Sequence, residues 1–366
     1  MAKIILSVIN DLVTDQRVHR VASSLQAAGY DVMLTGRKLK NSYPVKDRTY
    51  STKRLRLLFN KGFLFYAEYN IRLFFFLLFK KADILVANDL DTLLANFIAS
   101  KLKRKKLVYD SHEYFTEVPE LQGRDFARNI WLRIERCILP KVRYSYTVCD
   151  SIAEIYNKKY GIDMQVVRNL PVSYSGSPAE KKIDAGDRHI ILYQGSLNIG
   201  RGIGNVISAM QYIDNAVFVI IGDGDITGEL KDLVQKNNLQ EKVIFTGKIP
   251  LDELHLYTQQ ADIGISLEEN RGLNYYYSLP NKLFNYIQAH VPVLTNDFPE
   301  VKKIVEGYDI GITVSNYDPE FLAAKIKYML EPENRADWKN NLGKASRELC
   351  WQNEEGRLLE IFRQIK

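Results

Sequence analysis

The sequence has few cysteines and no repetitive or low-complexity stretch. Its three cysteines, Cys137, Cys149 and Cys350, lie far apart and never in CxxC spacing. This pattern excludes a disulfide framework and a structural zinc site, and it fits a reducing, cytoplasmic setting. The apolar run Ile4 to Ile9 is too short for a signal peptide, so we expect it to form a first strand.

The sequence also lacks a run that is long enough and free enough of charge to span a bilayer. Residues 62–81 are apolar and rich in aromatic side chains, but Glu68 and Arg72 interrupt them. With cations at both ends, this pattern predicts a helix that lies on an anionic membrane surface. The alternative is a buried crossover helix of an α/β domain with solvated ends.

The chain lacks the strong positive charge that is typical of a nucleic-acid-binding protein of this size. Its formal net charge is +6 and its pI is about 8.9, and 46% of its 366 residues are hydrophobic. We therefore expect a globular protein that binds no nucleic acid. The positive charge is clustered, at Lys53, Arg54, Arg56 and Lys61 and in KLKRKK at residues 101–106.

Short apolar runs alternate with helical patterns from one end of the chain to the other. This alternation predicts an α/β fold with two Rossmann-like domains, each a doubly wound parallel sheet, that face a cleft. The predicted boundaries are a first domain at 1–170, a polar linker at 171–188, a second domain at 189–348, and a closing helix at 349–366 that returns to the first domain. The predicted strands are residues 4–9, 32–35, 84–87, 107–109, 146–148 and 165–167, then 190–194, 217–221, 243–245, 263–266, 292–295 and 311–314.

Three glycine-containing loops follow predicted strands of the second domain. GSLNIGRGIG begins at Gly195, GDGDITGEL begins at Gly222, and Gly247 follows the third strand. Glycine lets the backbone approach a ligand closely, and Arg201 offers donors suited to phosphate oxygens. The loops predict a diphosphate site, although each of them alone could be an ordinary tight turn.

The stretch SLPNKLFNYIQ predicts an amphipathic helix that Ser278 caps. Leu279, Leu283 and Ile287 share its apolar face. Its polar face carries a cation and amides near the helix N-terminus, a combination that can bind anions and hydroxyl groups. The alternative is a capped surface helix with a solvated face. The residues of the polar face are Ser278, Asn281, Lys282 and Asn285.

Taken together, these stretches resemble the retaining GT-B glycosyltransferases of family 4 (glycosyl transferases group 1). The motifs run from YQGSLNIGRG through SLPNKLFNYIQAHVPVL, with NDLVTDQRVHRVASSLQ and YDSHEYF in the first half and CWQNEEGRLLEIF at the end. The resemblance covers nearly the whole chain. It implies transfer of a sugar from a nucleotide-diphosphate donor with retention of anomeric configuration and without a bound metal or other cofactor.

The resemblance also assigns roles to individual residues. Arg201 corresponds to the phosphate-binding lysine of the family and His112 to its active-site histidine. The chain departs from the family at Ser196, where an arginine is usual, and at Tyr277 and Asn285, where the family has paired glutamates. Lys282 is then the second cation for the diphosphate, and Asn285 can bind ribose hydroxyls.

Further carboxylates are expected near the substrates. Glu268 follows a strand of the second domain and is predicted to face the sugar in place of the missing glutamate, with Glu269 beside it. Asn10, Asp11 and Asp15 follow the first strand on the acceptor side, where a carboxylate could orient the acceptor hydroxyl. For Asp15 the alternative is a helix cap.

The predicted function is therefore a cytoplasmic glycosyltransferase of hexosyltransferase type, peripheral on the inner face of the membrane. Its donor is a nucleotide sugar, with UDP- or GDP-sugars favoured, and its acceptor is a lipid-linked glycan of surface polysaccharide biosynthesis. Two alternatives remain, a non-catalytic module that binds nucleotide sugars and a GT-B epimerase that isomerises the donor.

Overall fold

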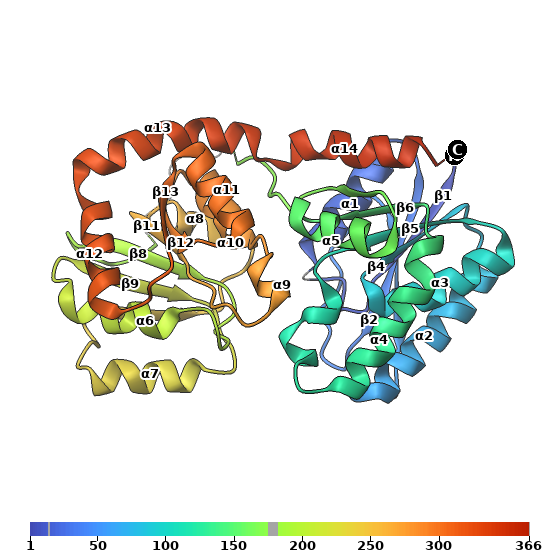
Figure 1. Cartoon of the computed structure of the whole chain (residues 1–366), viewed down its shortest axis with the longest axis horizontal. Coiled ribbons are helices and arrows are strands. Elements are labelled where there is room, and N and C mark those ends of the chain that lie inside the picture. Colours follow the sequence, from blue (N-terminus) through green and yellow to red (C-terminus); the bar gives the residue numbers. More distant parts are fainter. Residues whose placement is uncertain (14, 175–181, 366) are drawn as a thin grey trace. The chain divides into compact units, whose positions relative to one another are not determined.

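The computed structural model describes residues 1–13, 15–174 and 182–365. The chain forms two compact units (Figure 1). Unit 1 comprises Met1–Asn169 and Glu354–Lys366, and unit 2 comprises Leu170–Asn353. Within the predicted linker at 171–188, residues 175–181 lie outside the described part. Ile183 and Ala185, which follow, are buried in the core of unit 2.

Unit 1 is built on a seven-stranded parallel sheet in the order β3-β2-β1-β4-β5-β6-β7. The order reverses between β1 and β4, so the loops after these two strands open the crevice where doubly wound sheets bind ligands. The strands are β1 (Lys3–Ser7), β2 (Asp31–Lys38), β3 (Ser51–Arg56), β4 (Ile84–Asn88), β5 (Lys106–Ser111), β6 (Tyr144–Thr147) and β7 (Met164–Val166).

Helices cover the sheet of unit 1. On one face, α2 packs Tyr69, Leu73 and Leu77 against Ile5 and Leu85. Ala95 and Ala99 of α3 join this core, and α4 lies beside α3 (Figure 1). The helices are α1 (Gln16–Ala27), α2 (Gly62–Phe79), α3 (Leu90–Lys103), α4 (Asp125–Ile138) and α5 (Asp150–Tyr160), with 3-10 turns η1 (Phe115–Glu117), η2 (Pro119–Leu121) and η3 (Leu139–Lys141).

The C-terminal helix, α14 (Trp351–Arg363), is tied to unit 1 by its own side chains. The buried Glu354 accepts hydrogen bonds from the backbone N–H of Arg168 at 2.8 Å and from its guanidinium at 3.1 and 3.2 Å. Phe362 meets Tyr30 edge-on, with ring centroids 6.3 Å apart. These contacts join the last helix to residues far back in the sequence.

Unit 2 repeats the plan with a six-stranded parallel sheet in the order β10-β9-β8-β11-β12-β13. Its order reverses between β8 and β11. The strands are β8 (His189–Gln194), β9 (Ala216–Ile221), β10 (Val243–Gly247), β11 (Ile263–Ser266), β12 (Val293–Asn296) and β13 (Gly311–Val314). The prediction of two doubly wound parallel sheets is confirmed.

Two hydrophobic cores lie on the two faces of this sheet. Because neighbouring side chains of a strand point to opposite faces, Ile191 and Tyr193 enter one core while Ile190 and Leu192 enter the other. The helices around them are α6 (Ile203–Ala209), α7 (Thr227–Lys236), α8 (Leu254–Thr258), α9 (Leu273–Tyr276), α10 (Asn281–Gln288), α11 (Pro299–Tyr308), α12 (Pro319–Leu330) and α13 (Pro332–Glu348), with the 3-10 turn η4 (Met210–Tyr212).

The sequence did not predict one strand, and it misplaced the start of one helix. The strand β3 was not expected, because Ser51–Arg56 is a mostly polar edge strand and carries three of the cations that we read as a membrane flank. The helix α10 begins at Asn281 with Pro280 as its N-cap residue, so Ser278 is not the cap. The Ser278 hydroxyl instead donates to the carbonyl oxygen of Tyr275 at 2.8 Å.

Candidate functional site

The three predicted glycines of unit 2 lie side by side at the carboxyl ends of β8, β9 and β10. The N–H of Gly222 donates to the carbonyl oxygen of Gly247 at 2.9 Å, and the N–H of Gly195 donates to that of Ile221 at 2.9 Å. A Cβ atom on Gly222 would stand 1.8 Å from the carbonyl oxygen of Gly195, and its φ is +144°. Only glycine fits at this position, so the loops after β8 and β9 can touch.

Beside these glycines, a buried carboxylate joins the two predicted cations. Glu268 follows β11 and is 0% exposed. Its Oε1 accepts from Lys282 Nζ at 2.9 Å and from Arg201 Nη1 at 3.3 Å. We call Glu268, Lys282 and Arg201 the Glu268 cluster. With two positive charges and one negative charge, the cluster carries a net charge of +1.

Further groups fix the Glu268 carboxylate in place. Its Oε2 accepts from Ser266 Oγ at 3.0 Å and from Asn296 Nδ2 at 3.3 Å, and its carbonyl oxygen accepts from the Tyr317 hydroxyl at 2.7 Å. Both carboxylate oxygens are thus used inside the protein. Glu268 was predicted to face the sugar; the structure places its side chain in the interior, where it positions the two cations.

All three groups of the cluster are charged at neutral pH. Burial favours the neutral form of Glu268, but the neighbouring Lys282 and Arg201 outweigh it and lower the pKa of the carboxyl group. Burial likewise opposes the charge on Lys282 and on Arg201, yet the Glu268 carboxylate raises the pKa of each. Lys282 and Arg201 therefore stay charged although they are held close to a buried carboxylate.

Aromatic rings support both cations. The Lys282 ammonium lies 4.3 Å from the centroid of the Tyr193 ring, and the Arg201 guanidinium lies 5.0 Å from that of Tyr275. The Tyr193 hydroxyl donates to the carbonyl oxygen of Ser196 at 2.8 Å, which ties the loop after β8 to the ring beneath Lys282. Ser196 itself is exposed.

The polar side chains predicted to share one solvent-facing side of α10 differ in their exposure. Lys282 is buried in the Glu268 cluster, whereas Asn281 is exposed and Asn285 is half-buried one turn further on. Leu283 and Ile287 are buried in the core of unit 2, as their spacing predicted.

A cavity of about 380 Å³ opens next to the glycine loops. Gly222 and Gly247 line it, with Phe245 as an aromatic wall and Lys231 and Lys248 as cations. Asp223 also lines it and pairs with Lys248 at 3.6 Å. A flat ring with hydrogen-bonding edges and an attached anionic group fits such a lining.

In unit 1 the loops after β4 and β5 hold His112 between two carboxylates. Its Nδ1 lies 3.2 Å from Asp89 Oδ2 and its Nε2 lies 3.2 Å from Asp110 Oδ2. Asp110, which is fully buried, is also paired with Arg17, at 2.7 Å from Nη2 and 3.3 Å from Nε. Both ring nitrogens of His112 are therefore occupied within the protein.

This network keeps His112 charged. Burial lowers its pKa, but the Asp89 and Asp110 carboxylates outweigh burial and raise the pKa of His112 to about 9. Burial raises the pKa of Asp110, but Arg17 and His112 together lower it to about 2. With an N–H toward each carboxylate, the imidazolium is a donor in this arrangement and has no basic nitrogen. A direct contact between His112 and the sugar stays a prediction.

The three acceptor-side residues after β1 all have protein partners. Asp15 caps α1, since its Oδ1 accepts from the N–H of Val18 at 3.0 Å, and Asn10 donates to its Oδ2 at 2.6 Å. Asp11 is paired with Arg54 at 2.9 Å and also accepts from Ser42. The capping alternative for Asp15 is what the structure shows.

Sequence reasoning missed several members of these networks. Asn296 directly follows Thr295 at the end of a predicted strand, and this position could have identified it. Ser266 and Asp110 give the same signal, since each stands at the end of a predicted strand, two positions before Glu268 or His112. The other members carry no local signal, because the charged groups that they contact are distant in sequence. They are Tyr193, Tyr275 and Tyr317 in unit 2, and Arg17 and Asp89 in unit 1.

Two family models match the chain. Residues 15–170 match the model described as Glycosyltransferase Family 4, and residues 178–348 match the model described as Glycosyl transferases group 1. The alpha-monoglucosyldiacylglycerol synthase of Streptococcus pneumoniae is 41% identical over 100 residues. That match covers 27% of this chain and 21% of the synthase, so the chain spans about a fifth of that relative's length.

Solved structures resemble the chain over its full length. Sucrose-phosphate synthase from Thermosynechococcus elongatus is 18% identical with a TM-score of 0.81, over 100% of this chain and 99% of that one. HepE of Anabaena, solved in complex with UDP-glucose, is 13% identical with a TM-score of 0.77, over 100% of both chains. At these identities the likeness shows a shared fold.

Proposed function

Because this chain belongs to the family 4 glycosyltransferases and has their GT-B fold, we propose that it transfers a sugar from a nucleotide-diphosphate donor to a lipid-linked glycan acceptor, with retention of anomeric configuration. The observation that carries this proposal is the Glu268 cluster beside Gly195, Gly222 and Gly247. It combines two fixed cations with backbone that a ligand can approach closely.

In the proposed reaction the diphosphate leaves with the electron pair of the glycosidic bond, so negative charge builds up on its oxygens. Arg201 and Lys282 would neutralise this charge, and since Glu268 already fixes them, they need little reorganisation during the reaction. The nucleoside would occupy the cavity lined by Gly222, Phe245 and Gly247. A UDP- or GDP-sugar is the proposed donor, and the complex of HepE with UDP-glucose supports the first of these.

The lipid acceptor is supported by two observations. One is the local match to a synthase named for a glucosylated diacylglycerol. The other is α2. By length and composition it is, among the described residues, the one helix that could cross a membrane, contrary to the sequence-based prediction that this run is too short and too charged; 22% of its apolar window is buried in the protein. Since the buried side chains of α2 pack on the sheet of unit 1, we propose that it lies on the cytoplasmic face of a membrane rather than across it.

A calorimetric titration with UDP, GDP, ADP and CMP, each with and without EDTA, tests the donor site. We expect one nucleoside diphosphate to bind with the same affinity in both buffers, and Lys282→Met to weaken that binding. Lys327→Met, an exposed lysine on α12, is the matched control. Binding that disappears with EDTA would contradict a site that works through Arg201 and Lys282 alone.

A further inference from the structure

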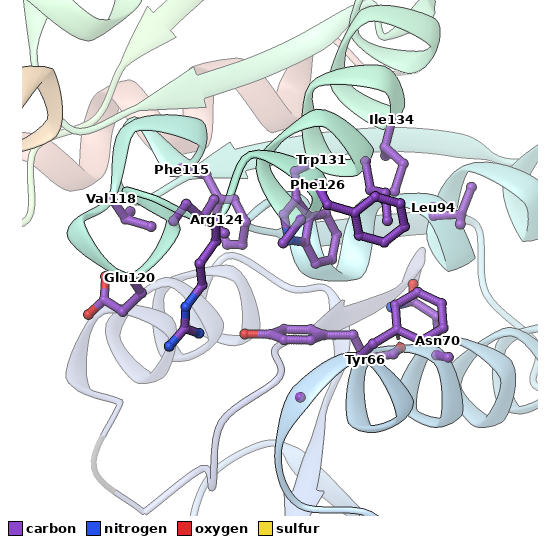
Figure 2. A pocket seen from close by; sticks show the side chains of 16 residues that line it. Tyr66, Asn70, Leu94, Phe115, Val118, Glu120, Arg124, Phe126, Trp131 and Ile134 are labelled. Carbon is purple, nitrogen blue, oxygen red and sulfur yellow. Dashed lines mark hydrogen bonds between the residues drawn. The ribbon is translucent and has the colours of Figure 1, made fainter.

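Unit 1 contains a second cavity, of about 400 Å³, that none of the predicted site residues lines. It lies between α2, α3 and α4, with the turns η1 and η2 at one end (Figure 2). Its volume falls within the range of roughly 300–1,000 Å³ typical of pockets that bind small molecules. We call it the α2–α4 pocket.

The walls of the α2–α4 pocket are mostly aromatic and aliphatic. Trp131 stands edge-on to Tyr66 and to Phe115, with ring centroids 5.2 and 5.3 Å apart. The polar Asn70 is already satisfied, because its amide donates to the carbonyl oxygens of Tyr66 and Asp91 and accepts from the N–H of Ala95. An apolar ligand can therefore bury its surface in the pocket without making a hydrogen bond to the interior.

Apart from the satisfied amide of Asn70, the polar groups of the pocket lie at one end (Figure 2). In Figure 2 the side chains of Glu120 and Arg124 and the hydroxyl of Tyr66 gather at one end, while Leu94 and Ile134 stand at the other. A ligand with a polar or anionic head and a hydrocarbon tail matches this gradient.

The pocket reaches the surface through apolar side chains. Phe63 from α2 is 68% exposed and Phe126 from α4 is 81% exposed, and both line it. Exposed apolar side chains then continue along α2, at Leu64, Ile71, Phe75 and Phe79. Exposed apolar side chains thus stand at the rim of the pocket and on a second side of α2.

Charged side chains surround α2 and the pocket, and the acidic Glu120 and Asp125 are exposed at the pocket and next to it. Exposed cations stand at both ends of α2, on the turn after α3 and along α4, namely Lys61, Lys80, Lys81, Arg104, Arg133 and Arg136. Cations flanking an apolar helix are the pattern that binds an anionic membrane surface. The chemistry that fits the whole arrangement is an anionic lipid, with its head near Arg124 and a hydrocarbon chain inside.

We propose that the α2–α4 pocket binds one hydrocarbon chain, acyl or prenyl, of the acceptor lipid, and so holds the acceptor on unit 1 during transfer. This inference rests on the proposed function for the identity of the lipid as acceptor. The binding of an alkyl chain to the pocket does not depend on it.

The binding test uses single-chain alkyl phosphates below their critical micelle concentrations, with the fluorescence of Trp131 as the readout. We expect saturable binding that tightens about fourfold for each added methylene until the pocket is full. Trp131→Phe should abolish the fluorescence response. Ala127→Phe, which fills the pocket, should weaken binding at least tenfold, and Leu102→Ser, at an exposed position of α3 outside the pocket, should leave it unchanged.

The transfer test separates the pocket from the proposed function. Lipid acceptors with long and short chains are compared in the wild type, in Ala127→Phe and in the milder Ala67→Leu, with a nucleotide titration to check that each variant is folded. We expect both pocket variants to raise KM for the long-chain acceptor and not for the short-chain one. Equal kinetics with both acceptors, or no saturable alkyl binding, would overturn the pocket assignment. Alkyl binding without transfer to any acceptor would overturn the proposed function instead.

Discussion

Removing one partner of the Glu268 cluster should destabilise unit 2 strongly. In Lys282→Met, Glu268 keeps the more distant Arg201, and in Glu268→Gln the buried Lys282 loses the carboxylate that lies 2.9 Å away. Breaking a buried ion pair from one side costs about 3–5 kcal/mol, since the remaining charge is left uncompensated. For a unit of this size each kcal/mol lowers Tm by about 2–4 °C, so we expect a loss of about 6–20 °C.

A double-mutant cycle distinguishes this pairing from general damage. The variant that combines Lys282→Met and Glu268→Gln should lose less stability than the sum of the two single variants, because no strong opposite charge remains to be compensated. Differential scanning calorimetry provides the Tm values, with Lys327→Met as the surface control. Losses of Tm that add up in the double variant would refute the pairing. A single variant whose Tm lies within roughly 1 °C of the wild type would refute it as well.

The same variants bear on ligand binding. A hydrogen bond to a charged group contributes about 1.5–3 kcal/mol, so Lys282→Met should weaken nucleoside diphosphate binding roughly 10- to 150-fold. Unchanged affinity in a folded Lys282→Met protein would show that this lysine is a structural partner of Glu268 and does not contact the diphosphate.

Three further predictions concern single positions. Gly222→Ala should disrupt nucleotide binding, because its Cβ would collide with the carbonyl oxygen of Gly195, whereas Gly228→Ala, whose Cβ meets nothing within 4 Å, should bind normally by calorimetry. The charged His112 should stabilise the fold by about 3 kcal/mol below the unfolded pKa near 6.5, and this stability should be lost as pH rises through about 9. Urea unfolding between pH 6 and roughly pH 10, where the loss is nearly complete, measures it. The free energy of unfolding of His112→Asn should depend much less on pH over this range. Asp15→Ala should cost about 1 kcal/mol through loss of the α1 cap, and Asp15→Ser should restore most of it without restoring a carboxylate; equal stability of Asp15→Ala and the wild type would argue against the cap.

The local pattern of apolar and polar residues was sufficient to predict most of the fold. Buried parallel strands are continuous apolar runs, and each one predicted in unit 2 is present in the structure. The edge strand β3 was not predicted, because Ser51–Arg56 buries little of its surface in the core and carries charged side chains, which an edge strand tolerates. The start of α10 was misplaced by two residues, because Ser278 is a good capping residue that uses its hydroxyl on Tyr275 instead.

The sequence predicted which residues belong to the candidate site, but not which of them contact one another. Glycine loops after strands and two cations near them could be read from the sequence, and the structure brings Arg201 and Lys282 together. That Glu268 turns inward toward them depends on Asn296 and Tyr317, which lie 28 and 49 positions further on in the chain. His112 depends in the same way on Asp89 from the neighbouring strand. Pairings across a sheet leave no trace in a local pattern.

The most direct test of the proposed function is a transfer assay with product analysis. The purified protein is incubated with radiolabelled UDP- and GDP-sugars and an extract of anionic membrane lipids, in the presence of EDTA, and the linkage of any product is determined by NMR. We expect label in the lipid fraction, in a new glycosidic bond with the anomeric configuration of the donor, and much less label with Lys282→Met. Label that stays in the donor, or an isomerised donor without a new glycosidic bond, would contradict the account.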